Sequence, residues 1–313
     1  MRALVYKSTG SWYTVKDETG KFRNARIKGI FKIDGITSTN PISVGDEVFI
    51  EEEIESENSV IISEIYPRRN YINRQSPRHK QQQHIIAANV DQSVLVATLK
   101  EPKTSQGFID RFLVACEMYH VPAVIVFNKA DLYKNKENEK YNEWKEMYEA
   151  VGYKVMLLSV TNNSGIDEVK EILKNKTSLM SGHSGVGKSS FINIICPELT
   201  IKTQDVSEWS GKGLHTTTFA EMYDLPPDSY RDGGKIIDTP GMREFGMVNL
   251  SKQELSHYFP EMRVRLNDCQ YNNCMHTNET DCAIKKAIEK EEINIDRYIS
   301  YCKILDTIEE KKY

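Results

Sequence analysis

The strongest indication of the fold is the sequence TSLMSGHSGVGKSSFINIIC at residues 177–196. Gly182 to Ser189 fits the pattern G-x-x-x-x-G-K-[ST], between a strand-like apolar run and a helix-like one. Glycines here let backbone N–H groups curve around phosphate oxygens at a helix N-terminus, which favours negative charge. Lys188 is expected to neutralise the β- and γ-phosphates, and the Ser189 hydroxyl to ligate Mg²⁺. The stretch therefore predicts a nucleotide-binding P-loop.

The segments around this loop alternate between apolar runs and helical patterns from residue 85 to residue 248. The strand-like runs are SVLVATL, AVIVFN, KVMLLSV, TSLMSG and GKIIDTP. The helix-like run FIDRFLVACEMYH places four apolar side chains on one face: Ile109, Phe112, Leu113 and Cys116. Two more runs, IDEVKEIL and SSFINIIC, also predict helices. Buried strands alternating with helices predict an α/β domain with a mostly parallel sheet covered on both faces.

A second motif, Asn128-Lys129-Ala130-Asp131, ends the run AVIVF and indicates which base is bound. The Asp131 carboxylate can accept from N1–H and the 2-amino group of guanine, a pair of donors that adenine lacks. Asn128 can reach the other edge of the purine and hold the phosphate loop, and the stem of Lys129 can lie over the ring. Ser159 and Val160 follow the next apolar run and are candidates to support the guanine oxygen. Together with the P-loop, the motif predicts GTP as the substrate.

A third motif, Asp238-Thr-Pro-Gly241, closes the run GKIID. Asp238 is expected to hold Mg²⁺ through water, and the Gly241 N–H to contact the γ-phosphate. One threonine of the preceding run HTTT should contact Mg²⁺ in the GTP state. Spacing does not distinguish Thr216, Thr217 and Thr218, and the central Thr217 is our candidate; an ordinary strand start is the alternative.

The residue after this motif is Met242, where many GTPases carry the glutamine that orients the attacking water. His215 is the best polar substitute, because an imidazole can orient or polarise water. A histidine that contacts only a partner or solvent is the alternative. Slow intrinsic hydrolysis is expected in either case.

The order of the motifs is permuted relative to common GTPases, since Asn128–Asp131 precedes the P-loop. The same sheet can form when a chain is cut and rejoined elsewhere, because domain termini often lie close together. The sequence from 85 to 248 therefore predicts a circularly permuted P-loop GTPase domain.

The N-terminal 66 residues contain short runs rich in Val, Ile, Tyr and Phe, broken by turn residues about every ten positions. This pattern predicts a small barrel or sandwich of about five strands. The next stretch, 67–84, has no hydrophobic period and is expected to be a basic linker. Five cations lie in a stretch without Asp or Glu, and they suggest an anionic partner: Arg68, Arg69, Arg74, Arg78 and Lys80. A merely solvated linker is the alternative.

Three of the six cysteines gather in the C-terminal segment, 249–313. Cys269, Cys274, His276 and Cys282 supply three thiolates and one imidazole, the donor set of a closed structural zinc site. Such a site would contribute folding energy to a small domain. Incidental surface thiols are the alternative. Cys116, Cys196 and Cys302 lie among apolar neighbours and are expected to be core thiols.

Composition restricts the class of protein. Hydrophobic residues make up 39% and charged residues 27%, which is typical of a globular chain, and the net charge of −4 argues against a general nucleic-acid binder. There is no apolar run of the roughly 18 residues that a membrane span needs, and no apolar core of signal-peptide length. We expect a cytoplasmic monomer without a membrane partner.

The ordered motifs NKAD, GHSGVGKSS, GLHTTT, DTPGMREFG and C-x₄-C-x-H-x₅-C resemble those of the RsgA (YjeQ/YloQ) family of circularly permuted GTPases. ANVDQ at Ala88–Gln92 and FPEMR at Phe259–Arg263 extend the resemblance over nearly the whole chain. The resemblance implies an OB-fold barrel, a permuted GTPase domain and a mainly helical zinc-binding domain. It also implies late maturation of the small ribosomal subunit, binding to its rRNA, and GTP hydrolysis stimulated by the subunit.

The family typically carries a hydrophobic residue at the position of Met242, and the histidine of its HTTT loop is implicated in hydrolysis, which favours His215 as the catalytic residue. The segment from Ser251 to Tyr313 departs from expectation, because its 10 Lys/Arg against 12 Asp/Glu give a net charge of −2. The expected GTP/GDP ligands are Asn128, Lys129, Ala130, Asp131, Ser159, Val160, Gly182, His183, Ser184, Gly185, Val186, Gly187, Lys188, Ser189, Ser190, Asp238 and Gly241.

Two other functions remain open from the sequence. Met242 is compatible with a nucleotide-gated RNA-binding switch that hydrolyses almost no GTP. A GTPase that serves a protein or membrane partner is disfavoured by the basic stretch and by the lack of an amphipathic anchor.

Overall fold

The computed structural model of the chain describes residues 1–27, 41–53, 59–75, 83–197, 220–226, 233–239, 247 and 250–308. Several expected functional residues lie outside these ranges: His215, Thr216, Thr217, Thr218, Gly241, Met242, Arg78 and Lys80.

The N-terminal strands form a closed five-stranded barrel, as predicted. The strands are β1 (Arg2–Ser8), β2 (Tyr13–Asp17), β3 (Phe22–Ile27), β4 (Glu47–Glu52) and β5 (Ser59–Ile65). They pair in the order β1-β2-β3-β5-β4, and pairing of β1 with β4 closes the barrel. Alternate side chains such as Val5, Val15 and Ile62 point inward to a buried apolar core, which is the period-two pattern of strands with one buried face.

The central domain contains the predicted parallel sheet. Its strands are β8 (Gln92–Ala97), β9 (Ala123–Phe127), β10 (Lys154–Leu157), β11 (Thr177–Ser181), β12 (Glu221–Leu225) and β13 (Gly234–Asp238). The order is β10-β9-β8-β11-β13-β12, with β12 antiparallel to β13 and the other neighbours parallel.

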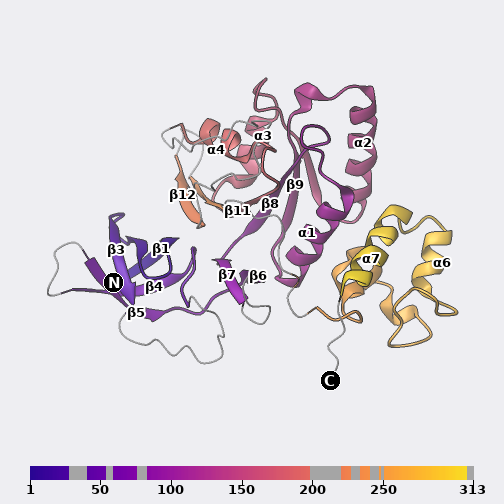
Figure 1. The fold of residues 1–313 in the computed structure, drawn as a ribbon, viewed down its shortest axis with the longest axis horizontal. Helices are drawn as coiled ribbons and strands as arrows, with labels where there is room; N and C mark the ends of the chain where they lie inside the picture. Colours follow the sequence, from indigo (N-terminus) through magenta and orange to yellow (C-terminus); the bar gives the residue numbers. More distant parts are fainter. Residues whose placement is uncertain are drawn as a thin grey trace, which may run out of the picture.

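Helices cover both faces of this sheet (Figure 1). They are α1 (Gln106–Met118), η1 (Ala130–Leu132), α2 (Asn135–Ala150), α3 (Ile166–Leu173) and α4 (Lys188–Ile195). Val94 and Val96 of β8 pack with α3 and α4, whereas Leu95 and Ala97 pack with α1 and α2. Burial of successive residues on opposite faces explains why these strands are apolar throughout.

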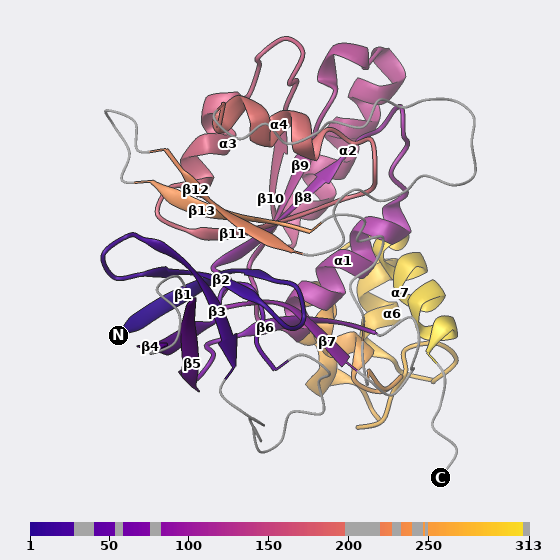
Figure 2. The ribbon, with the colours of Figure 1, turned by 60° about the vertical axis from the view of Figure 1, so that its left-hand side comes forward.

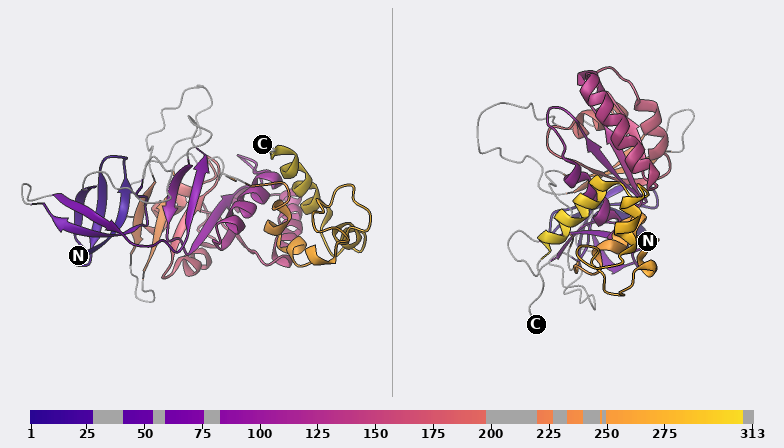
Figure 3. Two further views of the ribbon diagram at one scale, coloured as in Figure 1. Left: turned by 90° about the horizontal axis from the view of Figure 1, so that it is seen from below. Right: turned by 90° about the vertical axis from the view of Figure 1, so that its right-hand side faces the viewer.

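The C-terminal domain is built from short helices around the cysteine cluster. They are η2 (Leu255–Tyr258), α5 (Pro260–Arg263), η3 (Leu266–Asp268), α6 (Ala283–Glu289) and α7 (Ile295–Thr307). Figure 3 shows the barrel, the central domain and this domain following one another along the length of the molecule. Among the described residues, no helix has the length and apolar character needed to cross a membrane.

The expectation that residues 67–84 are an irregular basic linker was wrong in part. Residues here form a hairpin of β6 (Tyr71–Gln75) and β7 (Gln83–Ala88). Arg68 is not free for a phosphate, because its side chain is 9% exposed and its Nε lies 2.6 Å from Asp46 Oδ1. Arg69 pairs with Asp91 at 3.0 Å but remains 64% exposed.

The last helix, α7, leaves two of its isoleucines largely exposed. Ile295 and Ile299 are 52% and 40% exposed, while Arg297, Tyr301 and Ile304 are buried. The Arg297 guanidinium lies 2.5 Å from Asp110 of α1 and 2.8 Å from Glu261 of α5. These two carboxylates turn the arginine face of α7 toward the central domain, because a buried cation needs charged partners.

Candidate nucleotide and metal sites

The P-loop passes from β11 to α4 and needs glycine at two described positions. Gly182 has φ +136°, and a Cβ atom there would lie 2.2 Å from the Val96 carbonyl oxygen. Gly187 has φ +96°, and a Cβ there would lie 2.3 Å from the Asn128 amide nitrogen. Only glycine fits such close approaches in this backbone region. The loop therefore packs directly against the strand end that carries the second motif.

Lys188 opens α4 and faces the end of β13. Its ammonium donates to the carbonyl oxygens of Gly182 at 2.6 Å and His183 at 2.9 Å, which holds it over the loop. Burial lowers the pKa of Lys188 and raises the pKa of Asp238, while the attraction between the two charges opposes both shifts. Asp238 Oδ1 is buried and has no hydrogen-bond partner among the described residues.

The NKAD segment lies beside the P-loop, and Asn128 joins the two. Its side-chain amide donates to the Val186 carbonyl at 2.8 Å, and its Oδ1 accepts from the Val160 N–H at 3.3 Å. Asn128 is 1% exposed, so these bonds are shielded from water. Three predicted segments therefore meet at one amide.

Lys129 and Asp131 are held by neighbouring loops. Lys129 has φ +63°, a left-handed conformation that is unusual outside glycine, and its ammonium donates to the Glu101 carbonyl oxygen. Asp131 Oδ1 accepts from the Ser159 hydroxyl at 2.5 Å. The sequence suggested Ser159 as a support for the guanine oxygen and did not indicate that its side chain contacts Asp131.

All these groups follow the carboxyl ends of β8, β9, β10, β11 and β13, where open α/β sheets bind ligands. Phe108 of α1 was missed by the sequence analysis. Its ring stacks on His183 with centroids 3.8 Å apart. Apolar periodicity marked its helix but could not indicate that one ring would contact the P-loop.

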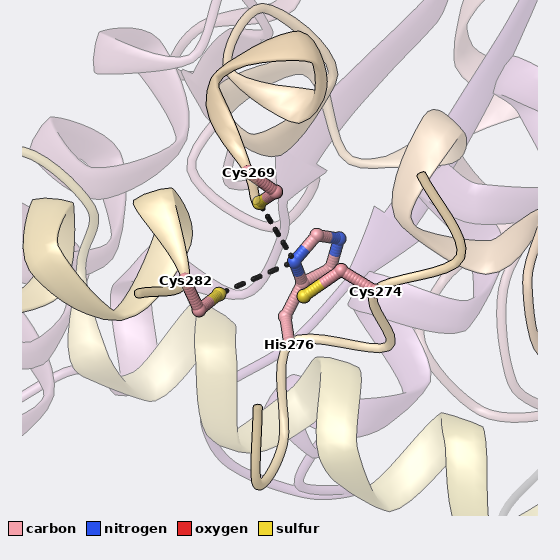
Figure 4. A group of neighbouring side chains, drawn as sticks. All are labelled: Cys269, Cys274, His276 and Cys282. Carbon is pink, nitrogen blue, oxygen red and sulfur yellow. Dashed lines mark hydrogen bonds between the residues drawn. The ribbon is translucent and has the colours of Figure 1, made fainter. Parts of the chain in front are cut away.

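Figure 4 shows the second candidate site, in which Cys269, Cys274, His276 and Cys282 converge. Their sulfur and nitrogen ligand atoms lie within 4.8 Å of one another. His276 Nδ1 is 3.6 Å from Cys269 Sγ and 3.4 Å from Cys282 Sγ. Tetrahedral zinc, with Zn–S of about 2.3 Å and Zn–N of about 2.0 Å, separates S and N ligands by about 3.5 Å. The donor set and its spacing therefore fit that ion.

Tyrosines of α7 hold the turn that presents His276. The Tyr298 hydroxyl donates to the His276 carbonyl at 2.7 Å, and the Tyr301 hydroxyl donates to the Met275 carbonyl at 2.8 Å. The Glu279 carboxylate accepts from the N–H groups of Met275 and Thr277, both at 2.8 Å. Such outer contacts orient metal ligands.

Comparison with known proteins places this geometry in a family. The model of the RsgA GTPase domain matches residues 65–248, and that of the RsgA N-terminal domain matches residues 3–61. The chain belongs to the RsgA family of GTPases. It is 50% identical over 305 residues to the small ribosomal subunit biogenesis GTPase RsgA of Cytophaga hutchinsonii, covering 97% of this chain and 98% of that protein. The same-named protein of Flavobacterium psychrophilum is 47% identical over 309 residues, or 98% and 93% of the two chains.

Two solved RsgA-family structures share the fold over nearly the whole length. YjeQ from Thermotoga maritima has a TM-score of 0.75 and 33% identity, covering 97% of this chain and 96% of that one. YloQ, a circularly permuted GTPase, has a TM-score of 0.74 and 28% identity, covering 100% and 96%. The chain is therefore a GTPase with the permuted order that its motifs predicted.

Proposed function

We propose that this GTPase acts late in maturation of the small ribosomal subunit, binds its rRNA, and hydrolyses GTP faster on the subunit. The family relatives are named small ribosomal subunit biogenesis GTPases, which supports the role. The observation that carries guanine-nucleotide chemistry in this chain is the contact of Asn128 with both Val186 and Val160, because it assembles the phosphate and base motifs into one site.

Within this site we assign the phosphates to the P-loop amides and Lys188, and the base to Asn128, Lys129 and Asp131. The site favours guanine, since a mismatched base would leave the Asp131 carboxylate without its donors. The other residues named as GTP/GDP ligands in the sequence analysis are proposed to line the same site. Gly241 and the threonines of the HTTT run lie outside the described residues, so they are predictions from the sequence alone.

Magnesium and zinc are the metals that we propose. The unpaired buried Asp238 Oδ1 and the Ser189 hydroxyl at the start of α4 fit the hydrated Mg²⁺ that accompanies GTP, with Thr217 as the further candidate. Bound Mg²⁺ would neutralise charge developing on the phosphates. The four-residue cluster fits one structural zinc ion and leaves no ligand position open for catalysis.

The test is GTP turnover measured with purified small subunits, with large subunits, and with no ribosome. Of the three reactions, only the one with small subunits should show strongly raised GTP turnover. Equal turnover in the three reactions would contradict the ribosomal role while leaving the GTPase assignment intact. Tight GTP-dependent subunit binding with almost no turnover would favour the nucleotide-gated RNA-binding switch.

We further propose that the chain works as a cytoplasmic monomer. Of the five cations expected to meet rRNA, Arg68 is engaged with Asp46, so the exposed Arg69 is the better candidate among the side chains described. Subunit affinity should fall steeply as ionic strength rises if such residues contact phosphates.

A further inference from the structure

Tyr133 follows η1 directly and is used by none of the motifs. Its side chain belongs to the buried cluster beneath α1 and α2, with Leu99, Phe127 and Tyr141 among its members, and the residue is 8% exposed. An aromatic residue in such a place would ordinarily contribute only packing.

The Tyr133 hydroxyl makes two hydrogen bonds to backbone groups of different segments. It accepts from the Leu99 N–H at 3.1 Å and donates to the Asn128 carbonyl at 2.8 Å. Burial raises the pKa of Tyr133 to about 12, so at neutral pH the hydroxyl keeps the proton that it donates. Leu99 and Asn128 are 5% and 1% exposed, so water has little access to either backbone group if the hydroxyl is removed.

The two segments joined by this hydroxyl meet a second time at the base site. The Lys129 ammonium donates to the carbonyl oxygen of Glu101, two residues beyond Leu99. The segment containing Glu101 is itself folded, because the Thr98 N–H donates to Thr104 Oγ1 at 3.0 Å and the Thr104 N–H to the Thr98 carbonyl at 2.7 Å. It therefore forms a fixed wall beside Lys129.

The bond to Asn128 acts on the peptide plane that leads into Lys129. That residue has φ +63°, a conformation that costs free energy for a residue with a Cβ and persists only where surrounding contacts hold it. Holding the Asn128 carbonyl fixes the start of this turn, and Ser159 holds its far end at Asp131. Release of the carbonyl would let Lys129 relax and move the Asp131 carboxylate relative to the base.

We propose that the Tyr133 hydroxyl is a positioning group for guanine selection, which fixes the turn from Asn128 to Asp131 against the wall formed by 98–104. The inference rests on the proposed guanine site. Tyr133 does not touch the base, and it acts through Lys129 and Asp131.

The experiment compares binding of GDP and inosine diphosphate, which lacks the 2-amino group, to the full-length chain by calorimetric titration. Tyr133→Phe keeps the ring and removes the hydroxyl. GDP affinity should fall roughly five- to tenfold and inosine diphosphate affinity less, so that the ratio of the two affinities shrinks. Tyr133→Met, a second hydroxyl-free variant, should shrink the ratio in the same direction.

Tyr153→Phe is the matched control. Tyr153 lies in the same buried cluster at 6% exposure, and its hydroxyl bonds to Glu117 at 3.2 Å, away from the NKAD turn. This variant should leave the ratio unchanged. A purely structural role for Tyr133 would lower thermal stability but not the ratio, and that result in both hydroxyl-free variants would overturn the inference.

Asp131→Asn separates failure of this inference from failure of the site itself. It should weaken GDP binding at least roughly tenfold, because the double acceptor becomes a mixed donor and acceptor. Unchanged binding would remove Asp131 from the site whatever Tyr133 does. A loss at Asp131 with an unaltered ratio at Tyr133 would overturn only the positioning role.

Discussion

The Ser159 hydroxyl, which donates to one carboxylate oxygen of Asp131, narrows the directions in which that side chain can accept from a base. A single hydrogen bond of this kind adds about 0.5–1.5 kcal/mol net to stability, or somewhat more when one partner is charged. Its larger effect is to orient the Asp131 carboxylate, since N1–H and the 2-amino group of guanine must both donate to it at the same time.

His215→Ala should leave GTP affinity nearly unchanged, because binding is assigned to Lys188, the loop amides and Asp131. It should reduce subunit-stimulated turnover by roughly 10²-fold, the effect typical of one positioned acid–base or polarising group. Turnover is compared with wild type at saturating small subunit, so that weaker docking cannot imitate a lost catalyst.

The exposed His257 in the C-terminal domain provides the control. His257→Ala should hydrolyse GTP at the wild-type rate under the same conditions. Equal turnover in wild type and His215→Ala would show that another group, such as rRNA, positions the water.

Residues within one motif could be proposed as ligands from the sequence, whereas contacts between distant segments could not. Asn128 and Lys188 could be assigned because their chemistry needs them at fixed spacing within one motif. Arg68 was misinterpreted because its partner, Asp46, lies 22 positions earlier. Tyr133 was not predicted because nothing in the sequence distinguishes a tyrosine that follows the NKAD motif and Leu132 from an ordinary core residue.

Helix α1 is the element that links the nucleotide site to the C-terminal domain. Phe108 near its start stacks on His183 of the P-loop, and Asp110, two residues later, binds Arg297 of α7. The Tyr148 hydroxyl of α2 donates to the same aspartate at 3.0 Å. One helix therefore contacts both the P-loop and the C-terminal domain.

Arg297→Ala should destabilise the chain by about 3–5 kcal/mol, because it leaves Asp110 and Glu261 buried without their cation. The free energy of unfolding is measured in urea. Arg263→Ala is the control at the same boundary, since Arg263 pairs with Glu117 of α1 at 2.8 Å but is 49% exposed. That surface pair should contribute less than about 1 kcal/mol, and similar losses in the two variants would contradict the buried role of Arg297.

The metal cluster is expected to stabilise the C-terminal domain. The purified protein should carry about one zinc ion, and Cys274→Ser should release it and unfold the C-terminal domain while GDP still binds. Metal analysis and GDP titration measure the two effects. Cys302→Ser, outside the cluster, should keep the metal, and a wild-type protein free of zinc would refute the assignment.

Elements with strong periodicity were predicted, and elements without it were not. The apolar face of α1 and the buried strands appear in the sequence because burial demands them. The strand β6, with the sequence YINRQ, is polar and lacks clear alternation, so only its partner β7 defines it. Helix α7 buries Arg297 against two carboxylates and leaves Ile295 and Ile299 largely exposed. Apolar periodicity alone could not indicate this orientation.

The barrel and the central domain share one hydrogen-bonded sheet of eleven strands. The first half of β1 pairs with β4 inside the barrel, and Lys7 in its second half pairs with Glu221 of β12. Figure 2 shows the sheet of the central domain directly above the barrel strands β1 and β2. Asp224 of β12 accepts from the Tyr6 hydroxyl and from Lys16, both at 2.6 Å. The two domains are therefore joined by strand pairing, by a side-chain hydrogen bond and by two salt bridges.

Asp224→Ala should weaken this junction, because it leaves the buried Tyr6 hydroxyl without its acceptor and Lys16 without its counter-ion. In wild type, GDP at about 100 times its Kd should add roughly 2.7 kcal/mol of stability. Hydrogen exchange should detect that gain in the barrel strands as well as in β8 and β11.

In Asp224→Ala the protection by GDP should stay in the central domain and be reduced in β2 and β5. Glu64→Ala, which removes an exposed carboxylate of the barrel, should behave as wild type. Undiminished protection of the barrel in Asp224→Ala would mean that the junction does not depend on this carboxylate.

Because β12 is synthesised long after β1, the two strands cannot pair until late in translation. Lys7 and Glu221 are 214 positions apart, so at about 5–20 residues per second the partner of β1 emerges roughly 10–40 seconds after it. Until then the barrel has a half-strand with an open edge next to Tyr6. A lysine at such an edge discourages pairing with a neighbouring chain, so we expect Lys7 to disfavour such pairing until it binds Glu221 in the finished protein.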